Sequence, residues 1–350
     1  MTTLTPTFSR GYIVDRKHDL IWFLGLPFVA VAAAFLSQRH LPGGALAAIA
    51  LWVTVPHHFV TWLRVYGSPA EFSRWRERFV LAPIALIVLT YALLYWAPLS
   101  LVLVVTLWDH QHSLMQQYGF ARVYDFKAKA GAPNTGKFDL YFNWILFANM
   151  LVVSPLFSTI WVRMLHEWHL PIGADTVLWV HRVSWTITLV YLAIYIGHIL
   201  WCVRRGYPLN PLKYLFLGAS YFLWYFTSFT THYLLVYAVA HRIMHGLQYI
   251  VMVYFYNRNK VERSGGDSSL LAFLGQAGNA KAFLLMCAAY ALVFHALTEG
   301  VVRDFGFGMV GFNSNFDLFS YSLLSSFALL HYYYDSFIWK VRKKEVQQGL

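Results

Sequence analysis

Apolar segments of about 20 residues recur along this chain from Leu20 to Ile338, with only short polar connections between them. A helix needs about 20 mostly apolar residues to cross the hydrocarbon layer of a bilayer, which is roughly 30 Å thick. The segments therefore predict an all-α chain that crosses a membrane many times.

The composition agrees with a membrane protein. Only 12% of the residues are charged and 58% are hydrophobic, whereas soluble domains carry about 25% charged residues. Because the apolar segments continue without a long polar linker, we expect a single integral membrane domain over residues 1–350. The two cysteines, Cys202 and Cys287, each lie in an apolar stretch, so a disulfide framework or a Cys-ligated metal site is not expected.

The length rule predicts a bundle of about ten transmembrane helices. These spans are residues 18–36, 42–66, 79–97, 100–122, 138–161, 176–203, 211–229, 231–256, 280–298 and 317–340. Lys and Arg residues gather in every second connection, and also before the first span and after the last. Since positive residues collect on the cytoplasmic side, the alternation predicts that both termini are cytoplasmic.

The same clusters account for the formal net charge of +11. The charge is therefore interpreted as a topology signal, and nucleic-acid binding is not expected. We expect an integral protein of a bacterial inner membrane, with membrane lipids as its surroundings.

Histidines are concentrated in the spans that share one direction, from outside to inside. Ionisable residues inside a span are costly and usually face a partner, a cavity or a functional site. Counted from the basic end of each span, one histidine per span lies about 9 to 20 Å deep, mostly in the cytoplasmic half of the bilayer. The candidate site residues held by these five spans are His57, His58, Asp109, His110, His112, His198, His241, His245, His331 and Asp335. They predict a shared layer of imidazoles.

Spacing indicates which side chains share a helix face. His241 and His245 are four residues apart, so both rings project from one face and could hold one ion or two neighbouring ions. His331 and Asp335 have the same spacing and offer a nitrogen and an oxygen donor.

Two further pairs leave an alternative open. His110 and His112 are two residues apart, about 200° around a helix, so we expect only one of them to face the layer. His57 and His58 are about 100° apart and leave the same choice.

Other polar residues beside the histidines are candidates for a supporting role. The amides of Gln116 and Gln248 could orient an imidazole. Arg242 lies deep in a span, where pairing with Asp109 or Asp335 is the expected arrangement. No catalytic residue is assigned from the sequence.

The donor set predicts a metal centre. Imidazole with an occasional carboxylate suits iron, zinc or copper, and argues against magnesium or calcium. The histidines exceed what one tetrahedral ion needs, so we predict two ions, most simply iron. The predicted ligands are His57, His58, His110, His112, His198, His241, His245, His331 and Asp335.

Two short motifs and the histidine-rich spans around them resemble known classes of membrane oxygenase. The motifs are PHHFVTW at Pro56–Trp62 and HRIMH at His241–His245. The many histidines near the cytoplasmic face resemble membrane di-iron oxygenases of the fatty-acid desaturase and hydroxylase type. An early Pro-His element and a late paired-His helix are similar to the bacterial Brp/Blh carotene dioxygenases. The resemblance implies a non-haem oxygenase that uses molecular oxygen, with an external electron donor where needed. Hydroxylation, desaturation or oxidative cleavage of a lipid-soluble substrate is then expected.

Two other functions stay open. A haem-binding electron carrier would use histidines on facing helices as axial ligands. A metal or proton transporter would use the His and Asp residues as a relay.

Overall fold

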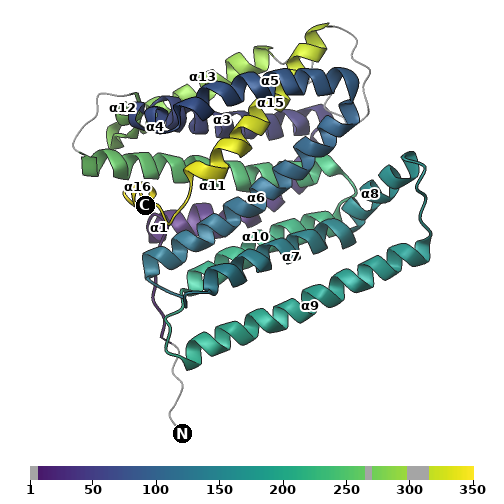
Figure 1. The fold of residues 1–350 in the computed structure, drawn as a ribbon, viewed down its shortest axis with the longest axis horizontal. Coiled ribbons are helices and arrows are strands. Elements are labelled where there is room, and N and C mark those ends of the chain that lie inside the picture. The colour runs from purple at the N-terminus through teal and green to yellow at the C-terminus, as the bar shows by residue number, and fades with distance from the viewer. Residues whose placement is uncertain (1–6, 265–269, 298–314) are drawn as a thin grey trace. The chain divides into compact units, whose positions relative to one another are not determined.

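The computed structural model describes residues 7–264, 270–297 and 315–350, and these residues are almost entirely helical. Extended pairing within them is limited to one parallel bridge between Phe8 and Leu209. The described residues of the ten predicted spans are mostly helical, so the expected all-α class is confirmed (Figure 1).

Within the described part of the chain, five helical segments are long and apolar enough to cross a membrane. They are Arg16–His40, Gly43–Tyr66, Arg76–Trp96, Ala174–Arg204 and Ala280–Leu297. The first combines α1 (Arg16–His18), a π-helical turn η1 (Asp19–Gly25) and α2 (Leu26–His40). The helices at the other predicted spans are rich in aromatic and polar residues. They include α6 (Pro98–Ala128), α10 (Pro211–Thr230), α11 (Leu234–Ser264) and α15 (Asn315–Ile338).

The predicted span at residues 138–161 is a broken one. It consists of α7 (Thr135–Val153) and α8 (Pro155–Glu167), which meet at an angle of 68°. Pro155 disfavours a helical conformation at Ser154, and the Ser154 hydroxyl instead accepts a hydrogen bond from the Phe157 amide at 3.4 Å. Counted as one crossing, this pair would bring the candidate spans to six.

Exposed apolar side chains on these helices indicate a lipid-facing surface. On α5 (Arg76–Trp96), Leu81 and Val88 are 62% and 64% exposed. On α9 (Ala174–Arg204), Leu189 is 60% exposed. Such continuous apolar surface is rare on soluble monomers but is expected in lipid. The helices are those of an integral membrane protein.

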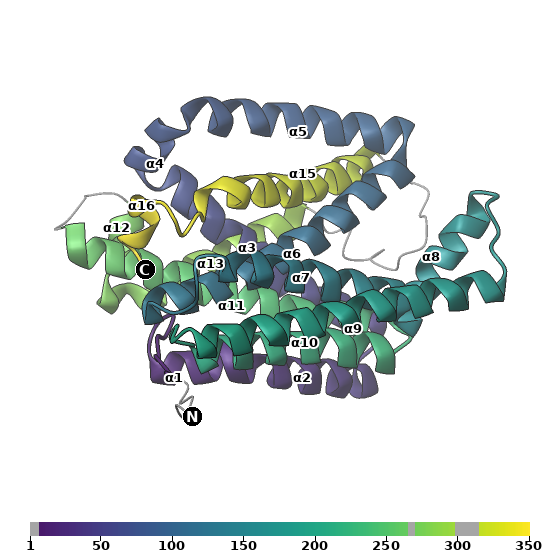
Figure 2. The same ribbon diagram turned by 60° about the horizontal axis from the view of Figure 1, so that its bottom comes forward.

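The chain divides into two compact units, whose boundaries lie inside α2, α6 and α11. The first unit is residues 1–37 and 114–241. In it α7 packs against α9, and α10 packs against α7 and α8 (Figure 2).

A buried ion-pair network ties the helices of the first unit together. Lys213 Nζ on α10 lies 2.9 Å from Asp125 Oδ2 and 3.1 Å from Asp139 Oδ2, and Arg122 Nη1 lies 2.7 Å from each of these oxygens. Tyr195 on α9 donates to Asp139 Oδ1 at 2.6 Å. Two cations balance two carboxylates, so the network serves helix packing.

The second unit is residues 38–113 and 242–350. It contains α3 (Gly43–Tyr66), α4 (Pro69–Arg74) and α5, then part of α6 and most of α11. The short α12 (Leu270–Gly275) and η2 (Ala277–Asn279), then α13 (Ala280–Leu297), α15 and α16 (Lys344–Gln347) complete it. Here α15 packs against α5 and α3, and α13 packs against α3. Apolar clusters fill these contacts, for example Val65, Phe79 and Phe337.

Candidate metal centre

Four histidines of the second unit meet in its interior. His57 on α3, His112 on α6, His245 on α11 and His331 on α15 each offer a ring nitrogen, and these four atoms lie within 4.8 Å of one another. Their residues are between 0% and 7% exposed. Metal–nitrogen bonds are about 2.0–2.1 Å long, so ligands of one ion lie within roughly 4 Å of each other. The four-histidine cluster could therefore hold a metal ion with small adjustments.

The clearest indication that the cluster could bind a cation is the His57 ring. Its side chain is buried, and neither ring nitrogen has a hydrogen-bond partner among the described residues. Burying a polar group without a partner costs about 1–3 kcal/mol. The His57 ring packs against the rings of His331 and His245, with centroids 4.3 Å and 4.7 Å apart. A bound cation would satisfy a nitrogen that the protein leaves unpaired.

The sequence brings these residues together through a repeated spacing. On α6 the residue four positions after His112 is Gln116, which belongs to the first unit. On the other three helices a cluster histidine is followed four residues later by a second polar side chain on the same face. These pairs are His57 and Thr61, His245 and Tyr249, and His331 and Asp335. Each of these three helices thus presents one imidazole and one hydrogen-bonding group to the same interior.

A glycine allows two of these helices to approach closely. A Cβ atom at Gly246 on α11 would lie 2.8 Å from Val53 Cγ1 and 3.7 Å from His57 Cβ on α3. Small residues permit close packing of transmembrane helices. Gly246 therefore sets the distance at which His245 and His57 face each other.

Beside the cluster lies a buried hydrogen-bond network. The Thr61 hydroxyl lies 2.8 Å from His331 Nδ1 and 2.7 Å from the Tyr249 hydroxyl. Tyr249 donates to Asp335 Oδ1 at 2.7 Å and accepts from Trp339 Nε1 at 2.9 Å. Asp335 Oδ2 lies 4.0 Å from His112 Nε2 and 3.8 Å from His331 Nε2. The predicted ligand Asp335 thus lies next to the cluster, outside the group of four.

The expected pairing of Arg242 is found with Asp109. Arg242 makes two hydrogen bonds to the Asp109 carboxylate, at 2.8 Å and 2.6 Å. Tyr332 donates to Asp109 Oδ1 at 2.8 Å, and its ring stacks on His112 with centroids 4.9 Å apart. Asp109 precedes His112 by three residues on α6, so the pair orients the helix face that presents His112.

The two open choices are decided by helix orientation. His112 joins the cluster, whereas His110 Nδ1 bonds the Thr106 carbonyl oxygen of its own helix at 2.7 Å. His57 joins the cluster, and His58 lies at its edge with its ring centroid 5.1 Å from that of His331. His58 Nε2 is buried and has no hydrogen-bond partner among the described residues.

Two predicted ligands have other surroundings. His198 belongs to the first unit, where its Nε2 lies 3.0 Å from the Thr135 hydroxyl and its ring stacks on Phe138 at 3.9 Å. His241 accepts a hydrogen bond on Nδ1 from Trp224 Nε1 at 2.8 Å, and its ring stacks on Tyr237. Of the predicted pair on α11, the group of four therefore includes only His245.

The two glutamines differ in their surroundings. Gln248 is fully buried on α11, three residues after His245. Gln116 is half-buried on α6 within the first unit.

The sequence did not single out three residues of the hydrogen-bond networks beside the cluster, namely Thr61, Tyr332 and Trp339. The signal that could have identified Thr61 is its four-residue spacing from His57.

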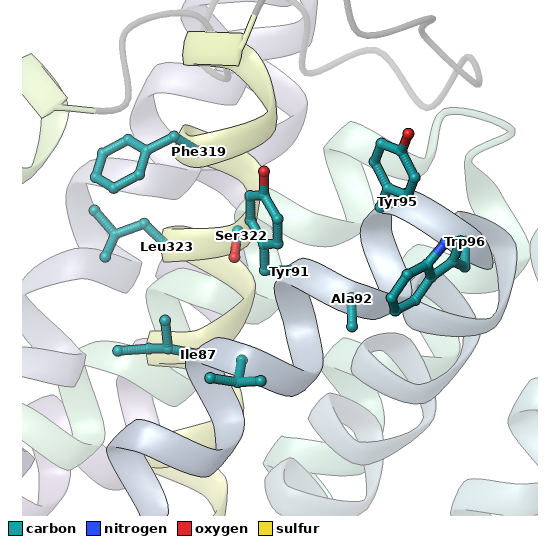
Figure 3. Close-up of a pocket in the computed structure, with 9 residues that line it drawn as sticks. Ile87, Tyr91, Ala92, Tyr95, Trp96, Phe319, Ser322 and Leu323 are labelled. Carbon is teal, nitrogen blue, oxygen red and sulfur yellow. The ribbon is translucent and has the colours of Figure 1, made fainter.

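An apolar groove of about 650 Å³ lies elsewhere in the second unit, between α5 and α15. Figure 3 shows Leu323 and Phe319 on α15 on one side of the groove and Ile87, Tyr91 and Trp96 spread along α5. Among the described residues, this lining consists of apolar and aromatic side chains with Ser322. Its surface suits a hydrocarbon.

The geometry can also be compared with known proteins. No family model matches this chain, and no curated protein or solved structure matches it. The chemistry of the four-histidine cluster therefore has to be inferred from its own residues.

Proposed function

We propose that this chain is a membrane-embedded oxidoreductase that uses a histidine-held metal ion and molecular oxygen to oxidise a lipid-soluble substrate. The observation that carries the proposal is the buried cluster of His57, His112, His245 and His331. Neutral imidazole suits iron and copper, which can change oxidation state. An ion held here would supply redox chemistry with oxygen inside the bilayer, where apolar substrates partition.

One ion, most simply iron, fits the cluster better than two. The four nitrogens are close enough to share an ion, and the described residues contain no second group of this kind. Metals in a two-ion site lie about 3.5–4 Å apart, and each needs ligands of its own. His58 and Asp335 lie beside the cluster, and either could supply a fifth or sixth ligand to the ion.

The packing of the cluster counts against haem. The imidazole rings pack against one another, with centroids 4.3 Å apart for His57 and His331 and 6.2 Å apart for His57 and His112. Axial haem ligands would instead lie on opposite sides of a macrocycle.

The surroundings favour a lipid-soluble substrate. The groove between α5 and α15 is apolar, and its Ser322 lies nine residues before His331 on α15, about 13 Å along the helix axis. We propose ten spans with both termini cytoplasmic, an acyl lipid, sterol or isoprenoid as substrate, and an external electron donor where the reaction needs electrons.

Metal analysis and oxygen uptake test this function together. Protein purified in detergent should contain about one redox-active metal ion and show no Soret band. Oxygen uptake should follow addition of an unsaturated phospholipid, a sterol or a polyisoprenoid, with a chemical reductant present and absent. His57→Ala should lose both metal and uptake, whereas His110→Ala should retain both. The proposal would be overturned if purified wild-type protein contained no metal or showed a haem spectrum. It would also be overturned if metal-loaded protein consumed no oxygen with any of the three lipids.

A further inference from the structure

Thr61 lies where α3 meets the two helices that carry His331 and Tyr249. It is fully buried, and its single hydroxyl lies within hydrogen-bond distance of three groups. These are His331 Nδ1 at 2.8 Å, the Tyr249 hydroxyl at 2.7 Å and Asp335 Oδ1 at 3.3 Å. A threonine hydroxyl has one hydrogen to donate and two lone pairs with which to accept.

The direction of these bonds follows from counting hydrogens. The Asp335 Oδ1 atom accepts a hydrogen bond from the Tyr249 hydroxyl at 2.7 Å, so the single hydrogen of that hydroxyl is used there. With its proton used, Tyr249 can only accept from its other neighbours, and Trp339 Nε1 is one of them. Thr61 therefore gives its hydrogen to Tyr249 or to Asp335. Toward His331 it has only a lone pair to offer.

His331 must then carry its ring hydrogen on Nδ1. The other ring nitrogen, Nε2, is left with a lone pair, and it lies 3.1 Å from His112 Nε2 inside the four-histidine cluster. A histidine that binds a metal through one nitrogen usually donates the hydrogen of the other to a neighbouring group, which fixes tautomer and orientation.

We propose that Thr61 is a positioning residue that holds His331 in the Nδ1–H tautomer and so makes Nε2 its metal-binding atom. The inference rests on the metal-binding part of the proposed function, and not on the reaction or substrate. A purely structural hydroxyl that links α3 to α15 would stabilise the fold without selecting a tautomer.

Metal binding by three variants tests the proposal, with Co²⁺ as the probe and a competing chelator to measure affinity. Thr61→Val keeps the shape but removes the acceptor, and it should weaken Co²⁺ binding about 10- to 100-fold. Thr61→Ser should bind within a few-fold of wild type. Thr54→Val is the matched control, because Thr54 is a buried threonine of the same helix whose hydroxyl donates to the Ala50 carbonyl oxygen of α3 at 2.8 Å. It should bind as wild type does.

Nitrogen NMR of ¹⁵N-histidine-labelled, metal-free protein gives an independent readout. The His331 signals, identified by their loss in His331→Asn, should show Nδ1–H in wild type and a shift toward Nε2–H in Thr61→Val. Wild-type His331 in the Nε2–H form would overturn the proposal even if Thr61→Val does not fold. Unweakened Co²⁺ binding by folded Thr61→Val would also overturn it. Wild-type protein that binds no metal would instead refute the proposed function, and the tautomer would still decide the role of Thr61.

Discussion

The Nε2 atoms of His112 and His331 lie 3.1 Å apart, although the two residues are 219 positions apart in the sequence. Two imidazole nitrogens this close repel each other unless a hydrogen or a cation lies between their lone pairs. Since Thr61 leaves a lone pair on His331 Nε2, the space between the rings favours either a hydrogen on His112 or a metal ion. A cation bound between the two rings would remove this repulsion.

Replacing the two histidines of α11 should have different effects. His245→Ala should remove most of the bound metal, because His245 belongs to the group of four. His241→Ala should retain it, because the His241 ring is held by Trp224 and Tyr237. Metal content of folded, monodisperse protein is the measurement. Equal loss from both variants would show that His241 is also a ligand.

Removing the metal should lower thermal stability. A ligand present at about 100 times its dissociation constant stabilises the folded state by about 2.7 kcal/mol. Wild-type protein should therefore unfold at a lower temperature after treatment with a chelator and recover when metal is restored. His57→Ala should show little difference between the two conditions. A chelator effect as large in His57→Ala as in wild type would place the stabilising ion elsewhere.

Gly246→Ala should disturb the contact between α3 and α11. The added methyl group would lie 2.8 Å from Val53 Cγ1, and we expect a loss of about 1–3 kcal/mol with weaker metal binding. Val53→Ala in the same chain should restore much of both. Gly218→Ala on α10 is the control, because a Cβ atom there meets nothing within 4 Å. Thermal unfolding and Co²⁺ affinity measure the effect, and an unchanged Gly246→Ala would contradict it.

The Arg242–Asp109 pair should behave as a coupled unit. Removing one partner leaves a charge in the interior, so Asp109→Asn or Arg242→Gln alone should cost about 2–4 kcal/mol. The double variant should cost clearly less than the sum, since neither charge is then left alone. A double-mutant cycle on unfolding free energy measures the coupling. Additive losses would mean that the two side chains act independently.

Glu71 on α4 should make stability depend on pH. Burial tends to raise the pKa of this carboxyl, but Arg64, Lys260 and Arg74 together hold it below the ordinary value of 4.5. Lys260 Nζ lies 3.4 Å from Glu71 Oε1. A lowered pKa gives stability that is present above the unfolded-state pKa and is lost as pH falls through the folded-state pKa.

Glu71→Gln should therefore be less stable than wild type at neutral pH, by about 1–3 kcal/mol, and should approach it in acid. Thermal unfolding at several pH values below 7 is the measurement. A constant difference between the two proteins across this range would show that the charge of Glu71 does not contribute.

The sequence by itself determined the helical membrane class and the layer of histidines. Segment length and hydropathy depend on neighbouring residues in the chain, and the four-residue spacing of His331 and Asp335 depends on one helix alone. Four of the histidines that the sequence singled out, His57, His112, His245 and His331, meet in the structure, each from a different helix.

The tertiary structure decided which face of each helix points inward. Spacing shows that His57 and His58, or His110 and His112, point in different directions, but not which direction meets the neighbouring helices. His241 and Thr61 depend on the same information: partners far along the chain turn His241 toward Trp224 and place Thr61 against His331. Helix rotation is set by packing between helices, so a local pattern can name the candidate ligands but cannot select among them.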